Sequence, residues 1–153
     1  MQANIPEAGR EYLAFSLGGE HYGIDIKQVR EIRALEPVTR LVEAPAYVRG
    51  VMNLRGSMVL VTDLRARFGM PPAEPGAQSV MIVIDARDMV GMVVDGVTDV
   101  VALRAGEIQS PASLQGAVDE RYVEGIATHD DRMLIVLDVV PLLTLAAPGD
   151  RVQ

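Results

Sequence analysis

The side chains that could support acid–base or metal chemistry are few in this chain. It has two histidines and no cysteine in 153 residues, which excludes disulfides, cysteine-ligated metals and a cysteine nucleophile. His21 follows a Gly-Gly turn, and His129 begins a His-Asp-Asp-Arg run. Both surroundings are typical of exposed turns. We therefore expect two solvated turn histidines and no metal site.

Two aspartates, Asp63 and Asp138, suggest the carboxylate pair that a hydrolase uses for acid and base catalysis. They occupy equivalent positions, each just before a short helix, where a side-chain oxygen can cap free backbone N–H groups. Capping is the favoured interpretation, and a hydrolase is the alternative. Phosphate-cradling glycine patterns and a G-x-S-x-G turn are absent from the sequence. The sequence predicts a protein that is not an enzyme and has no cofactor.

A more distinctive motif is the run Gly-Val-Met-Asn-Leu-Arg-Gly at residues 50–56. Turn glycines flank it, so Asn53 and Arg55 should lie near a tight connection between strands. An arginine keeps its charge and offers five donors in a rigid fork, which suits docking to carboxylates or carbonyls of a partner. The alternative is that Arg55 braces a neighbouring lobe. The run at 29–33 is explained mostly by core packing, with Arg30 and Arg33 on a solvated face.

The elements that must position these residues are mostly strands. Alternating or continuous apolar runs predict strands at 12–17, 21–24, 58–61, 79–85, 89–94 and 133–137. A short helix is expected at 64–68, because Gly69 and then Pro71-Pro72 stop it. Residues 70–78 are expected to form a loop that marks the boundary between the two halves of the sequence. Residues 1–10 and 147–153 are expected to be flexible tails.

The strongest structural signal is an internal duplication. A shift of 75 aligns residues 47–51 with 122–126, Tyr and Gly included, and aligns Asp63 with Asp138. A shift of 68 aligns Gly23 with Gly91 and residues 29–35 with 97–103. The difference between the shifts places an insertion between 103 and 122. Each copy offers about five short strands, and a small closed barrel leaves such strands no open edge. We expect two similar barrels packed together.

Composition excludes several classes of protein. The net charge of −7 and the 4% of aromatic residues argue against a nucleic-acid binder, which small barrels would otherwise permit. Residues 1–70 carry +1 and residues 71–153 carry −8, so the halves present different surfaces. The most apolar stretch, 133–143, contains Asp138 and Pro141 and is shorter than the roughly 20 residues of a membrane span. No signal peptide is visible, so we expect a cytoplasmic protein.

Several segments together resemble the signature of the CheW family of chemotaxis coupling proteins. The resemblance covers residues 11–145, which we take as one domain, and its most specific part is the Asn-Leu-Arg-Gly motif. The segments that carry it are 22–26, 29–32, 45–56, 61–65 and 68–69 in the first half, with 93–100 and 122–125 in the second.

The resemblance implies a mainly β fold of two intertwined five-stranded SH3-like barrels with short helices. It implies a scaffold without catalysis that links two partners. One is the regulatory domain of a CheA-type histidine kinase, bound at the equivalent ends of the lobes. The other is the cytoplasmic tip of methyl-accepting chemoreceptors, bound at a groove between the lobes. The positions that match the receptor-contact region are Val29, Glu31, Ile32, Gly50, Asn53 and Arg55.

One departure from the family pattern is Leu60, which stands where a proline is usual in the strand after Asn-Leu-Arg-Gly. The family also includes couplers of pilus-driven motility and of other chemosensory pathways, and such a role is the alternative function. In either case the resemblance implies a protein that is recruited to membrane-receptor arrays without inserting into the membrane.

Overall fold

The computed structural model describes residues 9–86, 88–109 and 120–143. The ten strands are β1 Arg10–Leu17, β2 Glu20–Asp25, β3 Val29–Ala34, β4 Val48–Leu54, β5 Ser57–Asp63, β6 Val80–Asp85, β7 Met89–Val94, β8 Gly96–Leu103, β9 Val123–His129 and β10 Arg132–Leu137. The helices are short: η1 Ile26–Gln28, α1 Leu64–Arg67, η2 Ala105–Glu107, η4 Glu120–Tyr122 and α2 Val139–Leu143. No described helix is long and apolar enough to cross a membrane.

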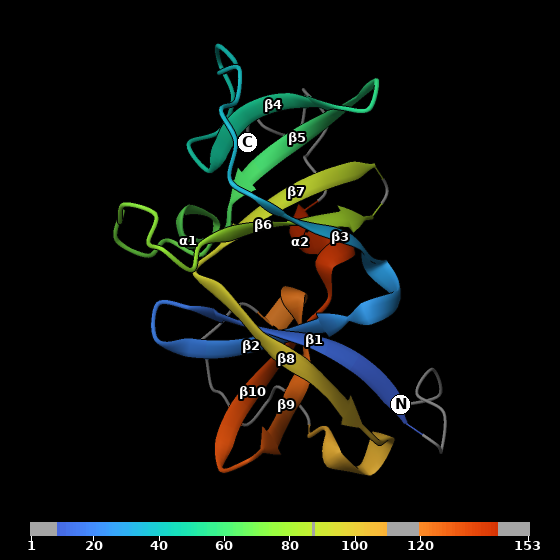
Figure 1. Ribbon diagram of the computed structural model, residues 1–153. Coiled ribbons are helices and arrows are strands. Elements are labelled where there is room, and N and C mark those ends of the chain that lie inside the picture. Colours follow the sequence, from blue (N-terminus) through green and yellow to red (C-terminus); the bar gives the residue numbers. More distant parts are fainter. Residues whose placement is uncertain (1–8, 87, 110–119, 144–153) are drawn as a thin grey trace.

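The strands form two five-stranded sheets, one in each of two lobes (Figure 1). The sheet order β8-β1-β2-β10-β9 defines the terminal lobe, and β3-β6-β7-β5-β4 defines the central lobe. In both lobes the third and fourth strands of the sheet order are parallel: β2 runs parallel to β10, and β7 runs parallel to β5. The predicted mainly β fold of two five-stranded SH3-like barrels is therefore confirmed.

The two sequence copies exchange strands between the lobes. The first copy gives β1 and β2 to the terminal lobe and β3 to β5 to the central lobe, and the second copy does the reverse. The chain thus passes between lobes at 25–29 and at 94–96. The loop at 70–78 separates the two copies, but it joins α1 to β6 within the central lobe. This exchange is what makes the barrels intertwined.

Each barrel is closed at the same place by an isolated β-bridge. Thr39, beyond β3, exchanges two backbone hydrogen bonds with Val51 of β4, at 2.8 and 2.9 Å. Gln109, beyond β8, makes the same pair of bonds with Ile126 of β9. The bridges join the outer strands of each sheet, so that little strand edge is left open.

Three apolar clusters form the core of the described residues. One lies inside each lobe: Ala14, Val101 and Leu134 belong to the terminal cluster, and Met52, Val59 and Val83 belong to the central one. The third and largest joins the lobes. It packs Leu13, Phe15 and Ile24 of β1 and β2 against Ile82, Ile84 and Met92 of β6 and β7. Along β1 and β6, successive side chains therefore alternate between the interior of their own barrel and the core shared with the other lobe.

Several strands are longer than expected, whereas β6 and α1 are each one residue shorter and β7 has the expected bounds. Arg10, placed in a tail by its polar neighbours, begins β1, because its backbone pairs with Leu103 of β8 and its side chain lies 3.4 Å from the Asp25 carboxylate. The expected helix at 64–68 is α1, with Phe68 as its C-cap. Residues 1–8 of the expected tail at 1–10, the expected tail at 147–153 and much of the insertion between 103 and 122 lie outside the described residues.

Asp63 and Asp138 are helix caps. One oxygen of Asp63 accepts from Arg65 N at 3.1 Å and from Ala66 N at 3.4 Å, and Asp138 accepts from Val140 N at 3.3 Å. Asp63 ends β5 of the central lobe, and Asp138 directly follows β10 of the terminal lobe. Their carboxylates are thus used by backbone N–H groups, as the capping interpretation predicted.

Replacing Asp63 with alanine should lower the free energy of unfolding by about 1 kcal/mol, because α1 loses its N-cap. Partner binding by the folded protein should persist. Thermal unfolding beside a binding titration checks this. Lost binding with an unchanged melting curve would instead make Asp63 a contact residue.

Candidate partner-binding site

The motif around Arg55 is a tight turn between β4 and β5. Arg55 and Gly56 both adopt positive φ, 51° and 90°, as a two-residue hairpin turn of the primed type requires. The Asn53 side chain stabilises the turn by accepting a hydrogen bond from Gly56 N at 2.9 Å. The turn leaves 67% of the Arg55 side chain exposed. The sequence prediction of an exposed arginine at a tight connection is correct.

Arg55 reaches from this turn to Glu31 of β3, with which it forms an ion pair. Glu31 also pairs with Arg33 at 3.2 Å, and Arg33 pairs with Glu36 at 2.6 Å. Because β3 and β4 are the two outer strands of the central sheet, this charged chain spans the place where the barrel closes. The contact lies within one lobe, so Arg55 does not brace the neighbouring lobe.

The hydrogen bond from Arg55 lowers the pKa of the Glu31 carboxyl, and the hydrogen bond from Arg33 lowers it further. Glu31 is therefore ionised at neutral pH, and the pair keeps both charges. The site is a fixed anion flanked by guanidinium groups, one of them mostly exposed. Such a surface can bind the polar side chains and backbone carbonyls of a protein partner.

The other expected contact residues lie close by on β3. The pairing with β6 is interrupted by a bulge between Val29 and Glu31. Val29 is half-buried against the core that joins the lobes, whereas Ile32 is 44% exposed. Glu31 and Arg55 thus come together, Asn53 stabilises the turn that carries Arg55, and Ile32 follows Glu31 on β3.

Gly50 differs from the other expected contact residues because it is buried and five residues from the turn. Its φ is 149°, and a Cβ there would lie 2.2 Å from the carbonyl oxygen of Thr39. Its copy, Gly125, is equally tight against the carbonyl of Gln109, at 2.4 Å. Both glycines let the closing bridge approach the strand. The structure therefore gives Gly50 a role in barrel closure.

The terminal lobe contains the copy of this site, built from different residues. Asp99 follows the same bulge on β8 that Glu31 follows on β3, and the β9–β10 turn has Asp130 and Asp131 at positive φ. Asp130 stands where the central lobe has Arg55. Within the described residues, Asp99 has no cation within 4 Å. The two lobes therefore present opposite charges at equivalent turns.

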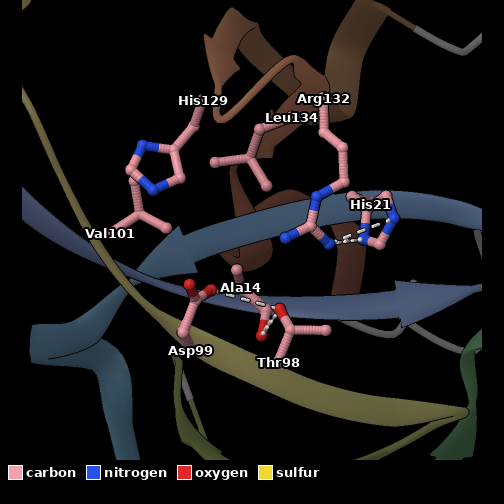
Figure 2. Close-up of a pocket in the computed structure, with 8 residues that line it drawn as sticks. All are labelled: Ala14, His21, Thr98, Asp99, Val101, His129, Arg132 and Leu134. Atoms are coloured by element: carbon pink, nitrogen blue, oxygen red, sulfur yellow. Dashed lines mark hydrogen bonds between the residues drawn. The ribbon is translucent and has the colours of Figure 1, made fainter.

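Both histidines line the hollow at this end of the terminal lobe (Figure 2). His21 lies on β2, 3.5 Å from a guanidinium nitrogen of Arg132, and His129 ends β9, 3.4 Å from the Asp130 carboxylate. The expectation of two solvated turn histidines is wrong, because both lie in strands and are partly buried. Strand pairing brings β2, β10 and β9 side by side. No group of three possible metal ligands occurs in the part of the chain that the structure describes.

Exposed apolar side chains occur at equivalent positions of the two lobes, and of these only Ile32 was singled out from the sequence. Met58 and Met133, which follow the two turns, are 63% and 55% exposed, and Ile32 and Val100 are 44% and 50% exposed. The duplication aligns each pair, so the repeat contained the signal. Exposed apolar residues repeated in both lobes indicate two related contact surfaces.

A second difference between the lobes concerns a pair of carboxyls. Arg49 of β4 lies 3.6 Å from Asp63, but the copy of Arg49 is Glu124, whose neighbour is Asp138. Desolvation, together with the charge of Asp138, raises the pKa of Glu124. A carboxyl with a raised pKa in the folded state destabilises the fold at neutral pH, and this effect disappears as the pH falls below the pKa of the unfolded chain.

Replacing Glu124 with glutamine should therefore stabilise the protein near pH 7, by at most about 1 kcal/mol at this surface position. The gain should vanish below about pH 4, where an unfolded glutamate is protonated. Urea unfolding of both proteins across this range measures the difference. A gain that grows as the pH falls would contradict the assignment.

Comparison with known proteins agrees with this architecture. The family model for the CheW-like domain matches residues 11–147. The chain is 40% identical to the chemotaxis protein CheW of Klebsiella aerogenes, over 89% of this chain and 82% of that one. It is 34% identical to the chemotaxis protein CheW of Bacillus subtilis, over 94% and 92%.

A solved structure shares the whole fold. The crystal structure of the scaffolding protein TtCheW from Thermoanaerobacter tengcongensis superposes with a TM-score of 0.83 and 32% sequence identity. The match covers 90% of this chain and 94% of that one. With the family model spanning the described residues from β1 to α2, these findings show that the chain belongs to the CheW-like domain family.

Proposed function

We propose that this protein is a non-enzymatic scaffold that couples methyl-accepting chemoreceptors to a CheA-type histidine kinase. The single observation that carries the proposal is that Arg55 is exposed on a hairpin turn and forms an ion pair with Glu31. The named members of the family to which the chain belongs are chemotaxis proteins. The helix-capping use of Asp63 and Asp138 supports a role without catalysis.

The receptor surface in this proposal comprises Glu31, Ile32, Asn53 and Arg55, with Val29 beneath them. Gly50 belongs to the site as the residue that allows β4 to close the barrel. The receptor tip would be bound through the fixed charges and the Ile32 side chain, and the protein would be recruited to membrane arrays by that contact. A coupler of pilus motility would use the same surface with a different receptor.

The kinase would contact the exposed apolar positions at the equivalent ends of the lobes. Met58 and Met133 support this, because each is exposed beside a turn and each has a counterpart in the other lobe. A kinase regulatory domain of similar double-barrel form would present related surfaces. Two separate surfaces, one for each partner, are what a coupler needs.

Calorimetric titration of a receptor signalling fragment and of the kinase regulatory domain, each alone, tests the proposal. Both should bind the chain, and neither should displace the other. Absence of binding to either one at concentrations that saturate a known coupler would refute it.

The isolated protein should be a monomer. Its sheets are closed by the bridges at Thr39 and Gln109, so no long strand edge is offered for pairing between the described parts of two copies. Sedimentation equilibrium at micromolar concentration measures the mass, and a stable dimer would contradict the expectation.

A further inference from the structure

Arg67 lies where the two sequence copies meet. Its guanidinium is stacked between two aromatic rings, 5.0 Å from the ring centre of Tyr47 and 4.7 Å from that of Tyr122. The duplication makes these two tyrosines equivalent. One arginine of the central lobe is therefore held by a tyrosine from each half of the repeat, in contacts that favour a cation over the face of a ring.

The polar contacts of Arg67 also cross between lobes. Nη2 lies 2.6 Å from the hydroxyl oxygen of Tyr122, and Nε donates to the carbonyl oxygen of Leu142 in α2 at 3.2 Å. Leu142 is the copy of Arg67 in the second half of the repeat. A residue in contact with its own copy lies on the axis that relates the copies. Here the repeat is asymmetric, because only one copy has the arginine.

This contact joins the ends of the two hairpins that bear the turns. Asp63 N, at the end of β5, donates to the carbonyl of Tyr47 at 2.7 Å, just before β4 begins. Asp138 N donates to the carbonyl of Tyr122 at 2.8 Å in the same way. The β4–β5 hairpin thus has Arg55 at one end and Tyr47 at the other, and α1 and α2 lie at the level where the lobes meet (Figure 1).

We propose that Arg67 is a positioning residue that ties the β4–β5 hairpin of the central lobe to η4 and α2 of the terminal lobe. A displacement of one hairpin is then transmitted to the other through the stack of Tyr47, Arg67 and Tyr122. The shared apolar core holds the lobes together, and Arg67 fixes how the hairpin ends lie against each other. If the two partners bind different lobes, as in the proposed function on which this part of the inference rests, the Arg67 contacts make binding at one lobe sensitive to binding at the other.

The test needs no partner protein. Arg55→Ala perturbs the far end of the β4–β5 hairpin, and amide chemical shifts of Val123 and α2 report on the terminal lobe. We expect Arg55→Ala to shift these resonances when Arg67 is present and to leave them unchanged in an Arg67→Leu background. Leucine is the residue at the equivalent position 142. Equal shifts in both backgrounds, or no shift in either, would overturn the proposal.

Three further variants separate positioning from a loss of stability. Tyr122→Phe keeps the ring but removes the hydroxyl, and Arg67→Lys keeps a charge without the planar fork, so each should transmit a reduced shift even if Arg67→Leu folds poorly. Arg30→Leu removes another arginine of the central lobe, whose exposed pair with Asp85 is 3.8 Å long, and should leave transmission intact. Reduced transmission with Arg30→Leu, or full transmission with both Arg67→Lys and Tyr122→Phe, would contradict a specific role for Arg67.

Partner titrations then test coupling separately. With both partners present, Arg67→Leu should leave each separate affinity within about twofold of wild type but remove the effect of one partner on the affinity of the other. If the wild-type protein binds neither partner, the proposed function fails while the chemical-shift result stands. If both bind and Arg67→Leu keeps the full mutual effect, the coupling role of Arg67 fails alone.

Discussion

Replacing Arg55 with alanine should weaken binding of a receptor signalling fragment at least tenfold and leave the melting temperature nearly unchanged. An anchoring arginine at a protein interface is typically worth about 2 kcal/mol or more, which corresponds to roughly 30-fold in affinity. The stability effect should be small because the side chain is 67% exposed and exposed ion pairs contribute little to folding.

The asymmetry of the repeat supports a binding role for Arg55. If barrel architecture required an arginine at this turn, its copy would keep one, yet Asp130 occupies the position with the same positive φ. Both turns form without a common side chain. The charge at position 55 is therefore free to serve a surface that only the central lobe has.

Titration of the fragment against the wild type, Arg55→Ala and Arg30→Ala decides the matter. Arg30 is a matched control, since it is an exposed arginine of β3 that pairs with Asp85 away from the turn. Stimulation of the kinase by receptor should fall with Arg55→Ala alone. Equal affinity and equal stimulation for all three proteins would return Arg55 to a structural role.

Replacing Gly50 with aspartate should prevent stable folding or cost more than about 3 kcal/mol. A Cβ would lie 2.2 Å from the Thr39 carbonyl oxygen, and the backbone has a φ of 149° that side chains rarely permit. The bridge that closes the central barrel would have to open. The resemblance implied only that Gly50 belongs to the receptor-contact region.

Urea unfolding measures the effect, with Gly56→Ala as the control. Gly56 also has a positive φ, 90°, but nothing lies within 4 Å of its added Cβ. Replacing Gly56 with alanine should lower the free energy of unfolding by only about 1 to 2 kcal/mol, which is the cost of placing a side chain in the left-handed backbone region. A Gly50→Asp protein as stable as wild type would show that the Thr39 bridge moves aside freely.

The repeat itself could be predicted because its copies share Gly, Tyr and Asp at structurally demanding positions. Tyr47 and Tyr122 accept the same backbone hydrogen bond, and Asp63 and Asp138 cap equivalent helices. The exchange of strands could not be predicted from spacing. A hairpin has the same alternating pattern whether it packs in its own lobe or in the other.

In the candidate site, too, local features could be predicted from the sequence and contacts between distant residues could not. Gly56 and the exposed arginine of the turn were evident, because local chemistry determines a tight turn. Gly50, also expected at a turn, lies inside β4. The partner of Arg55 was not evident, since Glu31 is 24 residues away and joins it only through barrel closure. The convergence of His21 and His129 depends likewise on a parallel pairing of distant strands.

In the proposed function this protein joins a receptor to a kinase. The most direct measurement is cosedimentation of the kinase with vesicles that display receptor signalling fragments, with and without the protein. The kinase should sediment in quantity only when the protein is added, and Arg55→Ala should lower that amount. Equal sedimentation of the kinase without the protein, or none with it, would contradict the account.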